Sequence, residues 1–429
     1  MVPSSRLIWI LAGVGFPASL AATVLPGAWA VVGIVFVAAL IDALMRKRVV
    51  AGIGVELPPL LRLAQGRPAE IPVRISNAGR KQRRIRVALC VPRQMQAEPE
   101  DQWLELPAGS LHSEVPWRCL PLARGTCRID QCLIEAPSLL GLWSVRSRVP
   151  TSLEVRIYPN LRDDRSLSAL RQGLLNRHVV RQIGRGREFE KLREYNPGDG
   201  SDEIHWKASA RRARPITKVF QIERTQEVYV VIDASRLSVR ETGGESALEL
   251  GIKAALTLNA VTERRGDLFG VAAFSSRMEA FVRARRGKTH YAACRDAINE
   301  LQPKPVSPDF EEVSVFLRTR LQRRALILFL TSLDDPVLAE HFARSTKLLA
   351  QRHVVIAGML RPHSARPLFS DDSATDVYGA LAGHLSWHHL REVQRTLARQ
   401  GASLALLEPD SFAANLVRLY DDVKQRQML

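Results

Sequence analysis

The chain begins with two long apolar runs. Residues 7–25 carry no charged side chain, and residues 28–45 carry only Asp42. Each run approaches the roughly 20 residues that a helix needs to cross the hydrocarbon core of a bilayer. A proline–glycine pair between the runs is a turn signal. The pattern predicts a two-helix transmembrane hairpin over residues 1–48.

Basic residues flank both ends of this hairpin. Arg6 precedes the first run, and Arg46, Lys47 and Arg48 follow the second. Lys and Arg beside membrane spans are retained on the cytoplasmic side. We therefore expect a multi-pass protein of the bacterial inner membrane, with both termini and all soluble domains in the cytoplasm. Asp42 is expected near the interface, so the hairpin is interpreted as an anchor without a transport role.

The next segment, residues 49–160, alternates apolar and polar positions with a period of two. Ile71–Ile75 and Ile85–Leu89 show the alternation most clearly, with turn residues Asn77–Gly79 between them. This period is typical of half-buried strands. Arg124 and Gly125 open a further strand. Since no helical period interrupts the segment, we expect a small β-sandwich.

Residues 225–429 follow a different pattern, in which apolar strands alternate with amphipathic helices. Val228–Ile232 is a continuous apolar run, typical of a strand buried on both faces. Further strands are expected at 269–274, 325–330, 354–360 and 404–407, and helices at 246–263, 290–301, 310–322, 336–350, 386–399 and from 412 onward. The alternation predicts an α/β domain with a mostly parallel sheet covered on both faces. Residues 161–224 remain as a linker.

Composition narrows the choice of partner. The 429 residues carry a net charge of +17, mostly from arginines scattered along the chain. Such an excess attracts nucleic acid, anionic lipid or acidic protein. No nucleic-acid recognition motif accompanies it, so no nucleic-acid partner is expected and an anionic lipid surface is favoured. The five cysteines lack the close spacing of a zinc knuckle and are interpreted as small buried hydrophobes.

The most distinctive string of the chain lies in the linker. Residues 186–211, here called the signature segment, combine alternating acids and bases, aromatic residues and a proline–glycine turn. The string resembles the signature of the bacterial DUF58 family, roughly Gly-x-Glu-Phe-x-x-Leu-Arg-x-Tyr-x-Pro-Gly-Asp followed by Ile-x-Trp-Lys-x-Ser-Ala-Arg. The candidates for partner binding within it are Arg187, Glu188, Phe189, Leu192, Arg193, Tyr195, Pro197, Gly198, Asp199, His205, Trp206, Lys207, Ser209 and Arg211.

The resemblance implies an architecture and a cellular context. It implies that residues 225–429 adopt a von Willebrand factor A-like, Rossmann-like fold behind the β-sandwich. Family members commonly lie beside MoxR-type AAA+ ATPases and transglutaminase-like membrane proteins. We therefore expect a membrane-anchored, non-enzymatic adaptor or scaffold that cooperates with such an ATPase, and with other membrane proteins of one assembly, in the maturation of protein complexes.

The A-like resemblance also implies a divalent-cation site. That fold often binds the ion through Asp-x-Ser-x-Ser, a threonine from a second loop and an aspartate from a third. Asp233, Ser235 and Thr289 fit the pattern, whereas Leu237 and Ser332 replace expected ligands. Oxygen ligands of this kind suit Mg²⁺ or Mn²⁺. Two interpretations stay open, a weakened metal site and a metal-free contact surface.

The signature segment also has two interpretations. In the first, Arg187, Glu190, Arg193 and Glu194 pair among themselves and Trp206 buries its ring, which locks the linker onto the α/β domain. In the second, the segment docks a partner protein. Exposed ion pairs contribute only about 0–1 kcal/mol each, which is a weak reason for so dense a cluster.

Two other function classes remain as alternatives. A hydrolase would use Asp199, His205 and Asp233, although no nucleophile motif accompanies them. A nucleic-acid-binding protein is the remaining class. His384 and His388 have helical ligand spacing, but no glutamate lies between them, so a zinc-protease motif is absent. The sequence also lacks a glycine-rich phosphate loop, which argues against an ATPase.

Overall fold

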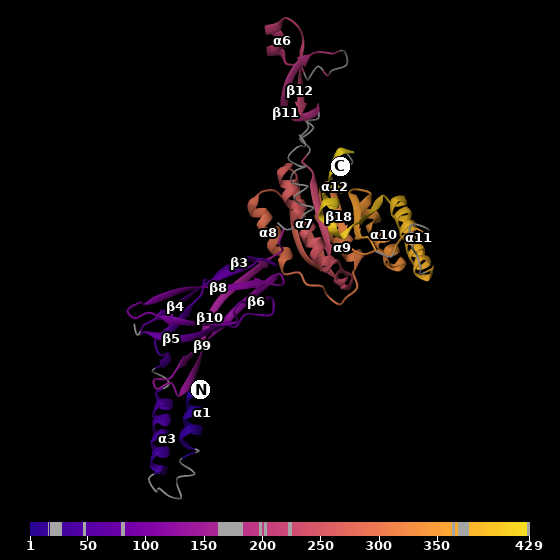
Figure 1. Cartoon of the computed structure of the whole chain (residues 1–429). Coiled ribbons are helices and arrows are strands. Elements are labelled where there is room, and N and C mark those ends of the chain that lie inside the picture. Colours follow the sequence, from indigo (N-terminus) through magenta and orange to yellow (C-terminus); the bar gives the residue numbers. More distant parts are fainter. Residues whose placement is uncertain are drawn as a thin grey trace. The chain divides into compact units, whose positions relative to one another are not determined.

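The computed structural model describes residues 1–15, 28–45, 49–78, 82–161, 183–196, 204–221, 225–362, 365–367 and 377–426, together with positions 17 and 200. The chain divides into two compact units, Met1–Asn160 and Leu161–Leu429 (Figure 1). Each unit has a hydrophobic core of its own.

The N-terminal helices correct the first prediction. Helix α1 spans Ser5–Ile10 and passes into a short π-helical turn, η1 (Leu11–Gly15), and helix α3 spans Ala28–Leu44. Within the described residues, no helix is long and apolar enough to span a membrane. The predicted two-helix transmembrane hairpin is therefore wrong. The same finding contradicts the predicted multi-pass placement in the bacterial inner membrane with cytoplasmic termini.

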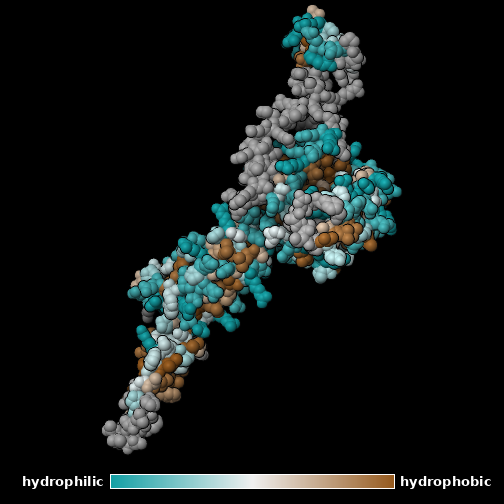
Figure 2. Space-filling model, turned by 45° about the vertical axis from the view of Figure 1, so that its right-hand side comes forward, coloured by the Kyte–Doolittle hydropathy of each residue, from teal (hydrophilic) through white to brown (hydrophobic). Residues whose placement is uncertain are grey.

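Asp42, which was expected near a membrane interface, is buried against the β-structure of its own unit. Its carboxylate accepts hydrogen bonds from the Ser138 hydroxyl at 2.5 Å and from the backbone N–H groups of Leu140 and Leu142 at 3.1 and 3.3 Å. Three donors from one turn thus fix the end of α3. Apolar side chains of α1 and α3 remain on the surface, which Figure 2 shows in brown at the lower end of the molecule.

Two sheets make up the rest of the first unit. One sheet has the order β1-β10-β9-β5-β7, with β3 also paired to β10, and the other has the order β2-β4-β8-β6. The strands are β1 (Val2–Pro3), β2 (Ile53–Glu56), β3 (Leu60–Ala64), β4 (Ala69–Asn77), β5 (Arg83–Leu89), β6 (Met95–Ala97), β7 (Asp101–Leu106), β8 (His112–Pro121), β9 (Gly125–Pro137) and β10 (Trp143–Tyr158). The predicted strands at 71–75 and 85–89 are confirmed. Their alternate residues, such as Ile71 and Ile85, lie in the shared core.

The second unit is built on a six-stranded sheet of order β17-β16-β13-β18-β19-β20. All neighbouring strands are parallel except β17 and β16, which are antiparallel. The strands are β13 (Glu227–Asp233), β16 (Leu268–Phe274), β17 (Met278–Arg285), β18 (Ala325–Leu330), β19 (Val354–Leu360) and β20 (Ala402–Leu407). Every residue of β13 is buried, as its continuous apolar run predicted.

Helices cover both faces of this sheet (Figure 1). One face carries α7 (Ala247–Arg264), α8 (Lys288–Asn299) and α12 (Phe412–Gln425), and the other carries α9 (Phe310–Arg320), α10 (Pro336–Ala350) and α11 (Val377–Arg399). Short elements complete the unit: η3 (Arg236–Val239), β14 (Glu241–Thr242), β15 (Glu245–Ser246) and η4 (Pro409–Ser411). The predicted α/β alternation is confirmed for this part, although β17 and the first turns of α11 were not predicted.

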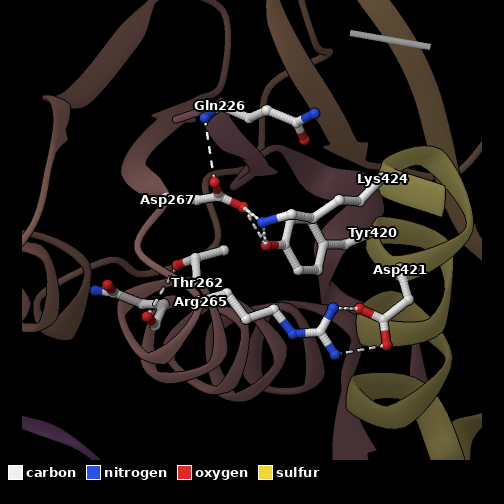
Figure 3. A network of polar contacts seen from close by, with 8 residues as sticks. Gln226, Thr262, Arg265, Asp267, Tyr420, Asp421 and Lys424 are labelled. Atoms are coloured by element: carbon white, nitrogen blue, oxygen red, sulfur yellow. Dashed lines mark hydrogen bonds and ion pairs between the residues drawn. The ribbon is translucent and has the colours of Figure 1, made fainter. Parts of the chain in front are cut away.

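A polar network fastens α12 to the amino end of the sheet (Figure 3). The buried carboxylate of Asp267 accepts hydrogen bonds from the Tyr420 hydroxyl, from Lys424 Nζ at 2.6 Å and from the backbone N–H of Gln226 at 3.1 Å. Arg265 pairs with both carboxylate oxygens of Asp421 on the same helix. The network therefore joins the start of the first sheet strand to the C-terminal helix.

The signature segment lies largely in a separate two-stranded sheet of the second unit. Strand β11 (Ile183–Glu194) pairs antiparallel with β12 (Ile216–Gln221), and the short helix α6 (Trp206–Arg212) lies between them in the sequence. We call these three elements the signature ribbon. His205 caps α6 by accepting the Ala208 N–H at Nδ1, at 3.1 Å.

Candidate functional site

The candidate site lies where β13, β18 and β19 end, at the carboxyl edge of the six-stranded sheet. Ligand sites of open α/β sheets form at this edge. Asp233 is the last residue of β13 and is only 3% exposed. Its Oδ1 accepts the Ser235 N–H at 2.8 Å, and its Oδ2 accepts the Thr331 hydroxyl at 2.6 Å. The carboxyl group is therefore engaged by two neutral donors from two different loops.

Burial is the main influence on the pKa of the Asp233 carboxyl group. Loss of hydration raises the pKa of Asp233 above its ordinary value, and the hydrogen bonds from Ser235 and Thr331 oppose that rise only in part. A carboxyl group in this setting holds its proton more readily than an exposed one.

A small open pocket lies beside Asp233. Its polar lining residues are Asp233, Ser238, Arg240, Thr331 and Ser332. Its other lining residues are Leu237, Ala247, Leu330, Gly358, Leu360 and Phe412. The pocket thus combines one guanidinium, one carboxyl group and several hydroxyl groups with aliphatic and aromatic side chains.

Arg240 supplies the positive charge of this pocket. Its Nη1 donates to Asp334 Oδ2 at 2.6 Å, and the two side chains are 40% and 41% exposed. The Ser332 hydroxyl donates to the other oxygen of Asp334 at 3.0 Å. Asp334, the acid nearest the expected third ligand position, is therefore paired with a cation of the chain itself.

Thr289 does not belong to this site. Strand β17 runs antiparallel to β16, so that Arg285 lies opposite Phe269 near the amino end of the sheet. Helix α8 begins directly afterwards, and Thr289 is an exposed residue of its first turn. The sequence prediction that joined Thr289 to Asp233 and Ser235 is wrong, because the reversed edge strand returns the chain to the opposite edge.

The segment that does reach the carboxyl edge was missed. Lys304 donates its backbone N–H to the Ala234 carbonyl at 2.8 Å, and the Val306 carbonyl accepts the Arg236 N–H at 2.9 Å. The Lys304 ammonium pairs with Glu279 at 2.6 Å, and this contact is the main reason that the pKa of Glu279 is lowered. Three prolines within residues 303–308 are a loop signal that could have identified this segment.

These contacts allow a test of the implied Mg²⁺ or Mn²⁺. Among the described residues, no group of three or more His, Cys, Asp or Glu side chains could hold a metal ion. Asp233 is buried and satisfied by neutral donors, Thr289 lies at the other edge, and Asp334 is paired with Arg240. The residues at the carboxyl edge do not fit a divalent cation.

The signature ribbon contradicts one part of the predicted clasp. The Trp206 side chain is 70% exposed and not buried. Glu194 pairs with Arg214, and Arg193 Nη1 donates to the Glu194 carbonyl at 3.2 Å. Within the signature segment, the following fall outside what the structure describes: the side chains of Arg187, Glu188, Phe189 and Glu190, and the turn residues Pro197, Gly198 and Asp199.

The remaining candidates of the segment have mixed placements. The Ser209 hydroxyl accepts the Ile216 N–H at 2.9 Å and so ties α6 to β12. Tyr195 is half-buried and donates its backbone N–H to Pro215. Lys207, Arg211 and Leu192 are exposed.

The alternative hydrolase site is not assembled by the described residues. His205 uses Nδ1 to cap α6, whereas Asp233 bonds to Ser235 and Thr331. The imidazole rings of His384 and His388 on α11 are in edge-to-face contact, with their centroids 4.9 Å apart. They form an aromatic contact that also includes Trp387.

The cysteines are mostly core residues. Cys119, Cys127, Cys132 and Cys294 are buried, whereas Cys90 is exposed, which corrects the prediction for that residue. Burial raises the pKa of Cys119 to about 11 and those of Cys132 and Cys294 to about 12. Thiols with such values are almost fully protonated at neutral pH and are poor nucleophiles.

Comparison with known proteins agrees with the resemblance over part of the chain. Residues 191–367 match the model of the family described as protein of unknown function DUF58. The chain is 24% identical over 262 residues to uncharacterized proteins of Mycobacterium bovis and Mycobacterium tuberculosis, covering 55% of this chain and 79% of each relative. The predicted DUF58 resemblance is confirmed for the matched residues.

Two solved structures are similar to this chain only weakly. Proximal thread matrix protein 1 from the mussel byssus is similar at 14% identity and a TM-score of 0.28, over 46% of this chain and 44% of that one. A protein of unknown function from Porphyromonas gingivalis is similar at 10% identity and a TM-score of 0.19, over 34% of this chain and 73% of that one. The chain thus spans less than half of the mussel protein, and neither likeness carries an argument.

Proposed function

We propose that this protein is a non-enzymatic adaptor that binds a partner protein through its signature ribbon. The observation that carries the proposal is Trp206, whose indole is 70% exposed at the start of α6. Exposed tryptophans are uncommon on free surfaces and are enriched at the centres of protein interfaces.

Charge around Trp206 indicates the kind of partner. The exposed residues of α6 and the following turn include Lys207, Arg211, Arg212 and Arg214, and α6 itself has no acidic residue. Figure 2 shows the atoms around α6, at the top of the view, mostly in teal, the colour of hydrophilic residues. An exposed indole on a helix that carries basic and no acidic residues suits an acidic surface with an apolar recess.

The hydrogen bonds of His205 and Asp233 favour an adaptor over an enzyme. His205 is committed to capping α6, and Asp233 is committed to holding two loops together. A general base needs a free lone pair within reach of its substrate. The nucleic-acid alternative rests on net charge alone, without a recognition motif.

A MoxR-type AAA+ ATPase is the partner that the family resemblance implies. The same resemblance suggests a von Willebrand factor A-like fold for residues 225–429, and the sheet with one antiparallel edge strand supports that assignment. In this proposal the ribbon contacts the ATPase, and the α/β unit presents a second face to a client protein.

The test is binding of the purified full chain to the purified MoxR-type ATPase of the same organism, measured by calorimetry. Replacing Trp206 with alanine is expected to weaken binding by about 2 kcal/mol or more, as at interface hot spots. Because the side chain is exposed, the free energy of unfolding should change by less than about 0.5 kcal/mol.

Trp103 offers a matched control. It is 48% exposed on β7, in the other unit, and the Arg84 guanidinium lies over its ring at 5.0 Å. Trp103→Ala removes another partly exposed indole without touching the ribbon. Equal losses for the two variants, or wild-type binding by Trp206→Ala, would refute the ribbon as the docking surface.

A further inference from the structure

The carboxyl edge of the sheet, which does not fit a metal ion, carries a fixed positive charge of its own. We infer that the Arg240 guanidinium acts as the fixed cation of this edge, and that the pocket beside it binds an acidic segment of a partner protein without any divalent metal. This inference concerns a different surface from the signature ribbon and does not rest on Trp206.

The first support is the position of the charge. Arg240 lines the pocket together with Asp233, Ser238 and Thr331. Its ion pair to Asp334, at 2.6 Å, orients the guanidinium, and the Ser332 hydroxyl donates to the same aspartate. The charge is therefore positioned by two residues of the loop after β18, where an incoming group can reach it.

The second support is the count of donors. A guanidinium carries five N–H groups, and only one of them donates to another described residue here. The arrangement of the remaining donors suits a carboxylate, which can accept two of them at once. Asp334 thus orients Arg240 and leaves most of its N–H donors available to a ligand.

The third support is the apolar part of the pocket lining. Leu237, Leu360 and Phe412 line the pocket together with the polar residues. A free, strongly hydrated anion gains nothing from apolar side chains, whereas an acidic side chain on a peptide with apolar neighbours gains from both kinds of residue. We therefore assign the pocket to an acidic protein segment and not to inorganic phosphate.

Asp233 presents little of its carboxyl group to such a ligand, because the residue is only 3% exposed and its two oxygens accept hydrogen bonds from Ser235 and Thr331. The cationic groups of this edge include Arg240, Arg236 and Lys304, of which Lys304 is paired with Glu279. Arg240 shares the exposed side of the pocket with its partner Asp334, so the attraction for an anion comes from the N–H groups that Asp334 leaves unused.

The experiment uses the full chain and a short fluorescein-labelled peptide of alternating glutamate and leucine, with binding followed by fluorescence anisotropy. We expect the same affinity in EDTA and in excess Mg²⁺. Arg240→Gln should weaken binding about tenfold, the usual effect of losing a hydrogen bond to a charged group. Inorganic phosphate should compete poorly.

Arg236 provides the matched control. It is exposed on the same edge, donates to the Ser307 hydroxyl at 3.2 Å and does not line the pocket. Arg236→Gln removes the same charge, so it corrects for non-specific attraction to a basic protein. We expect it to weaken binding less than about twofold.

Several outcomes would overturn the inference. They are absence of peptide binding by the wild type, a requirement for Mg²⁺, equal losses in the two arginine variants, and effective competition by phosphate. A calorimetric titration that detects Mg²⁺ binding by the wild type, abolished in Asp233→Asn, would overturn it as well. The ATPase is not used, so this result is separate from the test of the ribbon.

Discussion

At the residue scale, Asp233 shows how one buried carboxyl group can serve structure where a metal site was expected. It joins the loop after β13 to the loop after β18 through Ser235 and Thr331. Both donors are themselves shielded from water. A buried donor without an acceptor costs about 1–3 kcal/mol. The carboxyl group therefore stabilises the edge on which the pocket depends.

This role predicts a contrast between two substitutions. Asp233→Asn keeps an acceptor for the Ser235 N–H and can donate to the Thr331 hydroxyl, so we expect a loss below about 1 kcal/mol. Asp233→Leu leaves both donors unsatisfied and should cost at least about 2 kcal/mol more. Urea unfolding of the two variants measures the difference. Equal stability would show that the hydrogen bonds contribute little.

The pH dependence has a definite sign. Burial raises the pKa of Asp233 above its ordinary value of 3.8, so the folded state holds this proton more tightly than the unfolded state. The stability linked to the proton is complete below that ordinary value and is lost as pH rises through the raised one. Wild type should therefore lose stability relative to Asp233→Asn as pH rises from the acidic range. The opposite trend would mean that the folded protein favours the ionised form.

The site residues also mark the limit of sequence reasoning. Asp233 and Ser235 could be placed because a buried strand followed by polar residues fixes an edge of the sheet. Thr289 was misplaced because spacing along the chain does not reveal the direction of the preceding strand. Arg240 was not considered, since a surface arginine has no periodic pattern. Its meaning comes from a contact with Asp334, which lies 94 positions away.

At the element scale, periodicity identified buried elements better than edge elements. The fully buried strands β13 and β18 were predicted almost to the residue. Strand β17 was missed because most of its residues are only half-buried, so its pattern lacks a clear period. The run that became α3 was identified as helical, but apolar content could not reveal that Asp42 fixes it to the turn at residues 138–142.

Helix α12 is held to the sheet in part by one buried acceptor, Asp267. Tyr420→Phe removes one donor to that carboxylate, so we expect a loss of about 1.5–3 kcal/mol in the free energy of unfolding. Burial, and next the charge of Asp267, raise the pKa of Tyr420 above its ordinary value of 10.0. The hydrogen bond should therefore persist unchanged across neutral pH. Its stability is lost as pH rises past that ordinary value, because only the unfolded phenol then ionises.

Tyr291 is a suitable control for this change. It lies on α8, burial raises its pKa as well, and its hydroxyl makes no hydrogen bond to another described residue. Tyr291→Phe should leave stability within about 0.5 kcal/mol of wild type. If both substitutions cost the same in thermal unfolding, the loss would reflect the aromatic environment and not the bond to Asp267.

At the scale of the whole molecule, the chain contains two cores of different origin. The first comes from alternating residues on two sheets, and the second from continuous strands covered by helices on both faces. Near residue 225 the pattern of apolar residues changes to continuous apolar strands that alternate with amphipathic helices, and this change made the α/β part predictable. The prediction of an N-terminal transmembrane hairpin was wrong because it rested mainly on the length and apolar content of the two runs. The described helix α3 ends at Leu44, and near that end Asp42 is hydrogen-bonded to Ser138 of its own unit.

Two cores predict two unfolding events. Ile71 in β4 and Ile327 in β18 are both fully buried, one in each unit. Replacing either by alanine should cost about 2–5 kcal/mol, and distant sites add independently. In denaturant, followed by hydrogen exchange of the full chain, Ile71→Ala should move only the transition of residues 1–160, and Ile327→Ala only that of residues 161–429. A single transition shifted by both substitutions would show instead that the two units unfold as one cooperative body.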